Sequence, residues 1–324
     1  PVWERVVQNR KLQGKVKKLA GLMDQEIKHA QEWVEITGRI KDLEQESETM
    51  QKQVNALQES LPSGLGHAAN EQYAKVYQQL DAVAERFGEI HKELAGLHGK
   101  RHRLKQDRIQ KSFRKVLQVK DASPVHAAEF DAAHTEREKE AVGAAARWLT
   151  GLIASGPQGE TLPGFQVIKD DKPTTGRPGP SAFYRASQHA INVHSGMVSE
   201  ATNVHEMGHG IEYKIPGVQS AAQHFLRYRV KDEPLRKLND VLPTHGYGDW
   251  EEGREDDFGK ALGTDRAWYA GKKEYADGAT EIVSMGLEQL YRDPSGFARA
   301  DSEFCAFVAG VLDGSVRDVP VPER

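Results

Sequence analysis

The residues best suited to chemistry form one H-E-x-x-H sequence, made by His205, Glu206 and His209. Two histidines four positions apart share one face of an α-helix, so both imidazoles can reach a single metal ion. The neighbouring Glu206 is placed to take a proton from a metal-bound water. Either Ser199 or Thr202 can cap the start of such a helix. The spacing therefore predicts a helical zinc site with two histidine ligands and a glutamate as general base.

A third ligand is expected farther along the chain. A break at Asp277 and Gly278 precedes a helical pattern that places Glu281, Met285 and Glu288 along one face. Glu281 stands at the start of that helix. The residues alone leave Asp277, Glu281 and Glu288 as candidates, because only the fold can bring any of them to the histidines.

At these residues the chain resembles the gluzincin metallopeptidases of the anthrax lethal factor type. It is also similar to the related H-E-x-G-H domains of phage structural proteins and bacterial effectors. The resemblance lies in the H-E-x-G-H sequence at 205–209 and in Tyr275, which stands several residues before Glu281 and the apolar helix that Glu281 opens. It covers roughly residues 160–312 and leaves the N-terminal half of the chain outside.

The resemblance implies a zinc-dependent metalloendopeptidase that hydrolyses peptide bonds in a protein or peptide substrate. The implied Zn²⁺ ligands are His205, His209 and Glu281. The implied catalytic residues are Glu206, as general base, and Tyr275, whose hydroxyl would stabilise the oxyanion.

The chain departs from the family pattern in one place. Four positions after Glu281 it has Met285, whereas some relatives carry an acidic residue there that supports a ligand. Tyr269 is an alternative to Tyr275 as the oxyanion tyrosine, and Asp277 and Glu288 remain alternatives to Glu281 as ligand.

Two apolar series in the first 104 residues must form long helices. One runs with spacings of three and four over residues 12–61, a Pro/Gly-containing segment at 62–66 interrupts it, and the second covers residues 73–104. Two such seams predict an antiparallel coiled-coil hairpin with arms of roughly 50 residues, about 75 Å each. This coiled coil could also support oligomerisation.

Basic residues gather at the expected base of that hairpin. Residues 100–120 contain nine lysines and arginines against one acidic residue, Asp107. This charge run makes nucleic acid or an acidic protein a possible partner, although such runs are more often solvated helix faces.

The rest of the chain predicts a mixed domain that carries the motif. We expect a helix over 123–153, a strand at 165–168 and a β-hairpin at 182–185 and 190–194. A strand just before the metal helix would offer an edge to an extended substrate. Further predictions are a helix over 221–242, a Gly-rich flap at 243–264 and a closing core helix at 302–312.

These patterns together predict an α+β, mainly helical fold in which a zincin-like metallopeptidase domain follows the hairpin. The predicted domains are a coiled-coil hairpin at 1–120, a connecting helix at 121–155 and the metallopeptidase domain at 156–324. The alternative function is that of a structural or scaffolding protein, such as a component of a phage particle. In that case the metallopeptidase-like domain would be vestigial or serve only assembly.

Composition bounds these hypotheses. The 324 residues are 38% apolar and 28% charged with a formal charge of -4, an ordinary balance that by itself favours no nucleic-acid or membrane partner. No apolar run approaches 18 residues, so no membrane span is expected. The single cysteine, Cys305, is predicted to be a buried thiol. The chain starts with Pro1 and shows no signal segment, so we expect a processed piece of a cytoplasmic or virion-associated protein.

Overall fold

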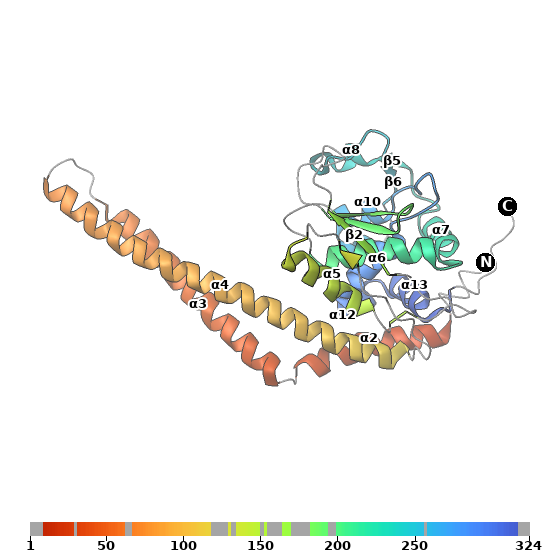
Figure 1. The fold of residues 1–324 in the computed structure, drawn as a ribbon, viewed down its shortest axis with the longest axis horizontal. Coiled ribbons are helices and arrows are strands. Elements are labelled where there is room, and N and C mark those ends of the chain that lie inside the picture. The colour runs from red at the N-terminus through yellow and green to blue at the C-terminus, as the bar shows by residue number, and fades with distance from the viewer. Residues whose placement is uncertain are drawn as a thin grey trace. The chain divides into compact units, whose positions relative to one another are not determined.

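The computed structural model describes residues 9–28, 31–61, 67–117, 129–130, 134–149, 152–153, 164–169, 182–193, 199–255 and 258–316. The chain is mainly helical with a small sheet. Its internal contacts divide it into two compact units. We call Gln25–Arg108 the helical unit, and Pro1–Asp24 together with Ile109–Arg324 the larger unit. Figure 1 labels the elements of both units.

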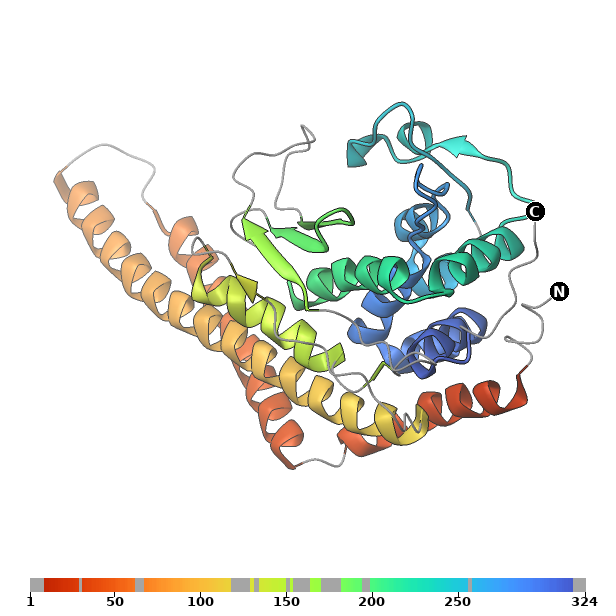
Figure 2. The ribbon, with the colours of Figure 1, turned by 45° about the vertical axis from the view of Figure 1, so that its right-hand side comes forward.

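The helical unit consists mostly of α3 (Gln31–Glu59) and the greater part of α4 (His67–Leu117). Both views show these helices side by side (Figures 1 and 2). Their shared core contains Leu43 and Met50 from α3 and Ile90 from α4. Three ion pairs join them: Glu32 with Lys100, Arg39 with Glu93, and Glu46 with Arg86. The residue numbers of the α4 partners decrease as those of the α3 partners increase, so the two helices run antiparallel.

Helix α2 (Arg10–Lys28) lies mostly in the larger unit, whereas α3 belongs to the helical unit. Its apolar residues Leu12, Val16 and Leu19 are buried. Lys15 pairs with Asp313 at 3.0 Å, and the Ala20 carbonyl accepts a hydrogen bond from the Ser295 hydroxyl. The expectation of a single seam over 12–61 is therefore wrong at its start. An apolar stripe indicates which face is buried but not which surface covers it.

The larger unit contains a four-stranded sheet in the order β1-β2-β4-β3. Strands β1 (Glu129–Phe130), β2 (Gln166–Lys169) and β4 (Ala190–Val193) run parallel, and β3 (Ala182–Arg185) is antiparallel to β4. The predicted strand and β-hairpin are thus confirmed. Among the described strands, β3 lies at an edge.

Helix α6 (Glu200–Lys214) runs through the centre of the larger unit, and Figure 2 shows its green ribbon between the strands and the blue C-terminal helices. It contacts α5 (Glu136–Leu149), α7 (Val218–Arg229), α11 (Ile282–Arg292) and strands β3 and β4. Nearly all of its residues from 201 to 212 are buried, as expected for a helix covered on all sides.

Shorter elements complete this unit. They are β5 (Arg236–Lys237), α8 (Leu238–Val241), the 3-10 turn η1 (Pro243–His245), β6 (Glu252–Gly253), α9 (Gly259–Leu262), α10 (Thr264–Ala270), α12 (Pro294–Ala300) and α13 (Ser302–Asp313). Helix α13 is the predicted closing helix, and Cys305 within it is buried as expected. None of the described helices has the length and apolar character needed to cross a bilayer.

Two helix predictions are corrected. Of the described residues in the helix expected over 123–153, Glu136–Leu149 alone are helical, and Glu129–Phe130 form β1 instead. The helix expected over 221–242 ends at Arg229 and is followed by a turn at 230–232 and then by Pro234, which lacks a backbone donor and disfavours helix before it. The expected flap at 243–264 is partly ordered by η1, β6 and α9. The predicted boundaries at 120 and 155, like the turn at 62–66, lie outside the described residues and stay predictions.

Candidate metal centre

Helix α6 carries both histidines of the H-E-x-x-H sequence. Of the two cap residues that the sequence allows, Ser199 is the N-cap, and its hydroxyl accepts a hydrogen bond from the Thr202 N–H at 3.1 Å. The buried apolar side chains of Val204, Met207 and Ile211 fix the rotation of the helix about its axis. His205 and His209 consequently lie on one face, one turn apart.

Glu281 reaches the histidines because α6 and α11 pack unusually closely. A Cβ atom on Gly208 would lie 2.6 Å from the Cα of Ser284, a distance that only glycine permits. Glu281 is the N-cap residue of α11, three positions before Ser284. The glycine of the H-E-x-G-H sequence therefore brings the start of α11, and Glu281 with it, against α6.

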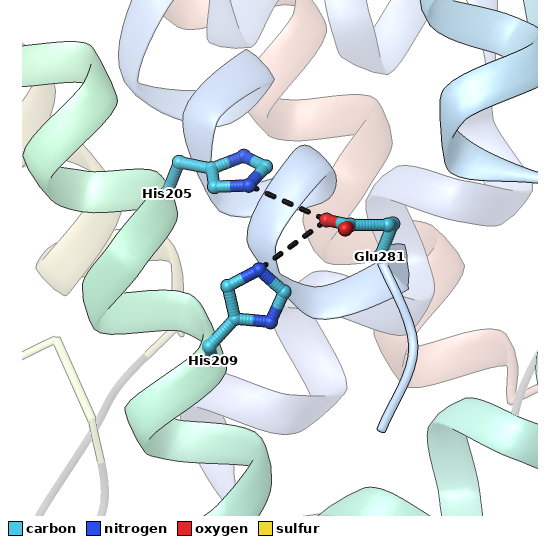
Figure 3. A group of neighbouring side chains, drawn as sticks. All are labelled: His205, His209 and Glu281. Carbon is cyan, nitrogen blue, oxygen red and sulfur yellow. Dashed lines mark ion pairs between the residues drawn. The ribbon is translucent and has the colours of Figure 1, made fainter. Parts of the chain in front are cut away.

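The three side chains form one cluster, drawn in Figure 3. Nε2 of His205 and Nε2 of His209 each lie 3.3 Å from the same oxygen, Oε2 of Glu281. In a tetrahedral site with metal–ligand bonds of about 2.0–2.1 Å, two ligand atoms are about 3.3 Å apart. The donor types and these separations fit a Zn²⁺ ion with a fourth position left for water or substrate. The structure thus holds a buried group of two histidines and a glutamate that could bind a metal ion.

The charges of the cluster favour a cation. Burial opposes a charged imidazole, but hydrogen bonds to Glu281 and Glu288 raise the pKa of His205 to about 10. Burial likewise opposes a charged Glu281, yet the two histidines hold its pKa well below the usual value. A site that stabilises positive charge on an imidazole also stabilises a divalent ion beside neutral imidazoles.

Glu288 contacts the other ring nitrogen of His205. Its Oε2 lies 3.2 Å from Nδ1 of His205, while Arg266 and Arg292 each approach the same carboxylate to 2.8 Å. Burial opposes its ionisation, but His205 and the two arginines lower the pKa of Glu288 to about 2. A carboxylate in this position fixes the ring and the tautomer of a metal-binding histidine. Glu288, which the sequence left open as an alternative ligand, therefore holds the ring of His205, a supporting role for which Met285 has no carboxylate.

Glu212 anchors the backbone that leads into Glu281. Its Oε1 accepts hydrogen bonds from the N–H of Thr280 at 2.7 Å and from the Thr280 hydroxyl at 3.0 Å. Burial raises the pKa of Glu212 well above its ordinary value. Because Glu212 follows His209 by three residues, one helix presents both histidines of the group and also holds the segment that carries Glu281.

Glu206 lies between the histidines and the edge strand. Its carboxylate accepts a hydrogen bond from the backbone of Tyr184 in β3, and burial raises its pKa. The backbone N–H of Tyr184 therefore points out of the sheet toward the site. The proposed general base and the backbone of the edge strand are in direct contact.

Both candidate tyrosines converge on Glu281. The Tyr275 hydroxyl donates to Oε1 of Glu281 at 2.5 Å. Tyr269 also hydrogen-bonds to Glu281, and its ring stacks on that of His205 with centroids 6.1 Å apart. Burial raises the pKa of each phenol, and the negative charge of Glu281 raises it further. The geometry brings both to the site without choosing between them.

A cavity of about 630 Å³ opens onto this group. His205, His209 and Glu206 form part of its wall, together with both tyrosines and part of β3. Its lining residues are Ala182, Tyr184, Arg185, Ala186, Ser187, His205, Glu206, His209, Tyr213, Tyr269, Tyr275, Ala276, Asp277 and Ala279. A volume of this size can hold several residues of an extended peptide.

The third alternative ligand, Asp277, is directed elsewhere. Its Oδ2 accepts the Tyr213 hydroxyl at 2.5 Å and its Oδ1 accepts the N–H of Ala279. Sequence reasoning did not identify Glu212 or the supporting role of Glu288. A signal existed for each: Glu212 is three residues from His209, and Glu288 shares a face with Glu281.

No protein-family model, curated protein or solved structure matches the chain. The site's geometry and chemistry therefore carry the functional argument.

Proposed function

We propose that this protein is a zinc-dependent metalloendopeptidase of the gluzincin type. The observation that supports the proposal most directly is the convergence of His205, His209 and Glu281 beside Glu206 at the wall of a cavity. A structural zinc site is usually closed by four protein ligands, whereas three protein ligands beside a carboxylate and an open cavity are typical of catalytic zinc. In this proposal the larger unit has a zincin-like fold, and α3 and α4 form an antiparallel coiled-coil hairpin.

The substrate would be an extended peptide lying along β3. An edge strand offers unpaired backbone groups that can pair with a substrate backbone whatever its side chains. The contact between Glu206 and Tyr184 supports this arrangement, because the proposed general base would then lie at that edge. A peptide bond in the cavity would then lie next to both.

Each residue has a defined task in hydrolysis. His205, His209 and Glu281 would hold the zinc, which when bound supplies Lewis acidity for the carbonyl and acidifies water. Glu206 would accept a proton as water attacks the carbonyl carbon and then deliver it to the leaving amine. Tyr275, or Tyr269 in its place, would donate a hydrogen bond to the developing oxyanion. No covalent intermediate with the protein is required.

The test combines metal analysis with a cleavage assay on the full chain. We expect about one zinc per chain, lost in His209→Ala and Glu281→Ala. The matched control is His224→Ala, because His224 bonds the Ser220 carbonyl on α7 and lies outside the cluster. Glu206→Gln should keep zinc and lose at least about 100-fold in turnover of a randomised peptide library.

Tyr275→Phe and Tyr269→Phe identify the oxyanion donor. The variant that lacks the donor should retain zinc and lose about 10- to 1000-fold in turnover. Zinc retained by both ligand variants, or undiminished cleavage by Glu206→Gln, would refute the proposal. Stoichiometric zinc with no cleavage of any peptide would favour the scaffolding alternative.

A further inference from the structure

A buried ion pair lies behind Tyr275. Lys272 is 7% exposed, and its ammonium donates hydrogen bonds to Oε1 of Glu251 at 2.8 Å and to the Tyr275 hydroxyl oxygen at 2.9 Å. The same hydroxyl donates its proton to Oε1 of Glu281. A continuous chain of hydrogen bonds therefore runs from Glu251 through Lys272 and Tyr275 to the metal cluster.

Glu251 holds the outer end of this chain in place. Its second oxygen accepts the backbone N–H of Gly248 at 2.8 Å. The surrounding backbone is paired as well, since Gly253 forms an isolated bridge with Lys272 and the Lys273 N–H donates to the Glu252 carbonyl. The Lys272 ammonium is thus fixed in position by a carboxylate that is itself fixed.

Stability alone is a poor explanation for this pair. Removing both charges from water costs several kcal/mol per ion, and well-packed apolar residues often do as well or better in such places. The ammonium also lies over both tyrosine rings, 4.4 Å from the Tyr275 centroid and 5.6 Å from that of Tyr269, so the nearer ring contact and the hydrogen bond both fall on Tyr275.

A phenol oxygen has one proton to donate and lone pairs that accept. When Lys272 occupies the acceptor side of the Tyr275 oxygen, the proton must point away from it, toward Glu281 and the cavity. A cation bound to that oxygen also polarises the O–H bond and makes it a stronger donor. Tyr275 is 39% exposed and, without Lys272, its hydroxyl could turn to solvent.

We propose that Lys272, held by Glu251, is a positioning residue that orients and polarises the Tyr275 hydroxyl for the oxyanion. Lys272 does not line the cavity, so it acts through Tyr275 rather than on the substrate. The inference rests on the proposed peptidase function and extends it by two residues. It also selects Tyr275 over Tyr269 as the oxyanion donor.

The test is Lys272→Met in the full, zinc-loaded chain, because methionine keeps much of the apolar stem and removes the ammonium. Zinc content and KM should stay within about twofold of wild type, while kcat falls about 10- to 100-fold. In a Tyr275→Phe background the same change should add no more than about twofold, because the group it positions is gone. The matched control is Lys273→Met, whose lysine is exposed and pairs with Glu252.

A second readout does not depend on cleavage. With tyrosine labelled at Cζ with ¹³C, the Tyr275 resonance, identified by its absence in Tyr275→Phe, should shift in Lys272→Met and not in Lys273→Met. If Lys272→Met fails to fold, Glu251→Gln takes its place in both measurements. It keeps the acceptor for Gly248 and removes the charge that holds Lys272.

An unshifted Tyr275 resonance, an unchanged kcat, or an equal loss of kcat with and without the Tyr275 hydroxyl would each overturn the inference. These results are distinguishable from failure of the proposed function. If wild type cleaves peptides and needs Glu206 but not Lys272, only the inference about Lys272 fails. If neither wild type nor any variant cleaves peptides, the shift of the Tyr275 resonance alone decides whether Lys272 controls the Tyr275 hydroxyl.

Discussion

Gly208 permits the close approach of α6 and α11 that brings Glu281 to the histidines. In Gly208→Ala the new methyl carbon would lie 2.6 Å from the Cα of Ser284, whereas ordinary contact begins at 3.4 Å. The two backbones must therefore separate by about 0.8 Å (3.4 minus 2.6), since no flexible side chain can yield in their place. The substitution adds one methyl group to a buried face of α6, which α11 covers.

Two consequences follow in different measurements. Overpacking typically costs about 1–3 kcal/mol, and the better helix propensity of alanine returns about 1 kcal/mol, so the free energy of unfolding should fall by roughly 0–2 kcal/mol. The effect on zinc should be larger, because ligand positions tolerate only about 0.2 Å and Glu281 moves with α11. We expect zinc affinity to fall about 10- to 100-fold.

The assay is competition for zinc against a chromophoric chelator, with thermal unfolding of the metal-free protein alongside. Gly14→Ala is the matched control, because Gly14 lies within α2 and a Cβ there would meet nothing within 4 Å. In that variant the free energy of unfolding should rise by up to about 1 kcal/mol, and zinc affinity should equal that of wild type. If Gly208→Ala behaves like Gly14→Ala in both measurements, the close approach does not position Glu281 and the reasoning is wrong.

Two further predictions concern other parts of the chain. Glu288→Gln should weaken zinc binding about 10-fold, because His205 loses a charged partner at Nδ1. The control is Glu252→Gln, which alters an exposed ion pair and should leave zinc affinity unchanged. Equal zinc affinities of the two variants in the chelator assay would contradict this prediction. Ile90→Ala should destabilise the helical unit by about 2–5 kcal/mol, since Ile90 is 0% exposed in the α3–α4 core, and should leave zinc content unchanged. Tyr77→Ala, at a side chain 56% exposed on the same helix, should cost under about 0.5 kcal/mol, and amide hydrogen exchange of α3 and α4 measures both.

Sequence reasoning succeeded where a short-range rule applies. The four-residue histidine spacing, the cap at Ser199 and the start of a helix next to Glu281 are all local, and each is found in the structure. The strands at 166–169, 182–185 and 190–193 were predictable for the same reason, because alternation and turn residues act over a few positions.

It failed where two distant elements meet. The spacing along α11 placed Glu288 about 10 Å from Glu281. That spacing could not reveal that α11 also runs along α6, where Glu288 meets the far nitrogen of His205. The stripe of α2 was recognised as buried but was assigned to the wrong surface. Lys272 and Glu251 carry no pattern at all, since 21 residues separate them and only the fold pairs them.

The burial of α2 against the C-terminal helices also sets an order in time. Lys15 and its partner Asp313 are 298 positions apart, so a ribosome must deliver almost the whole chain before this contact can form. During that interval the apolar face formed by Leu12, Val16 and Leu19 is not yet buried, whereas α3 and α4 can already pack together. Long-range closure of this kind slows folding and extends the exposure of apolar surface. In a cell, α2 would thus stay accessible to chaperones from its synthesis until α13 emerges.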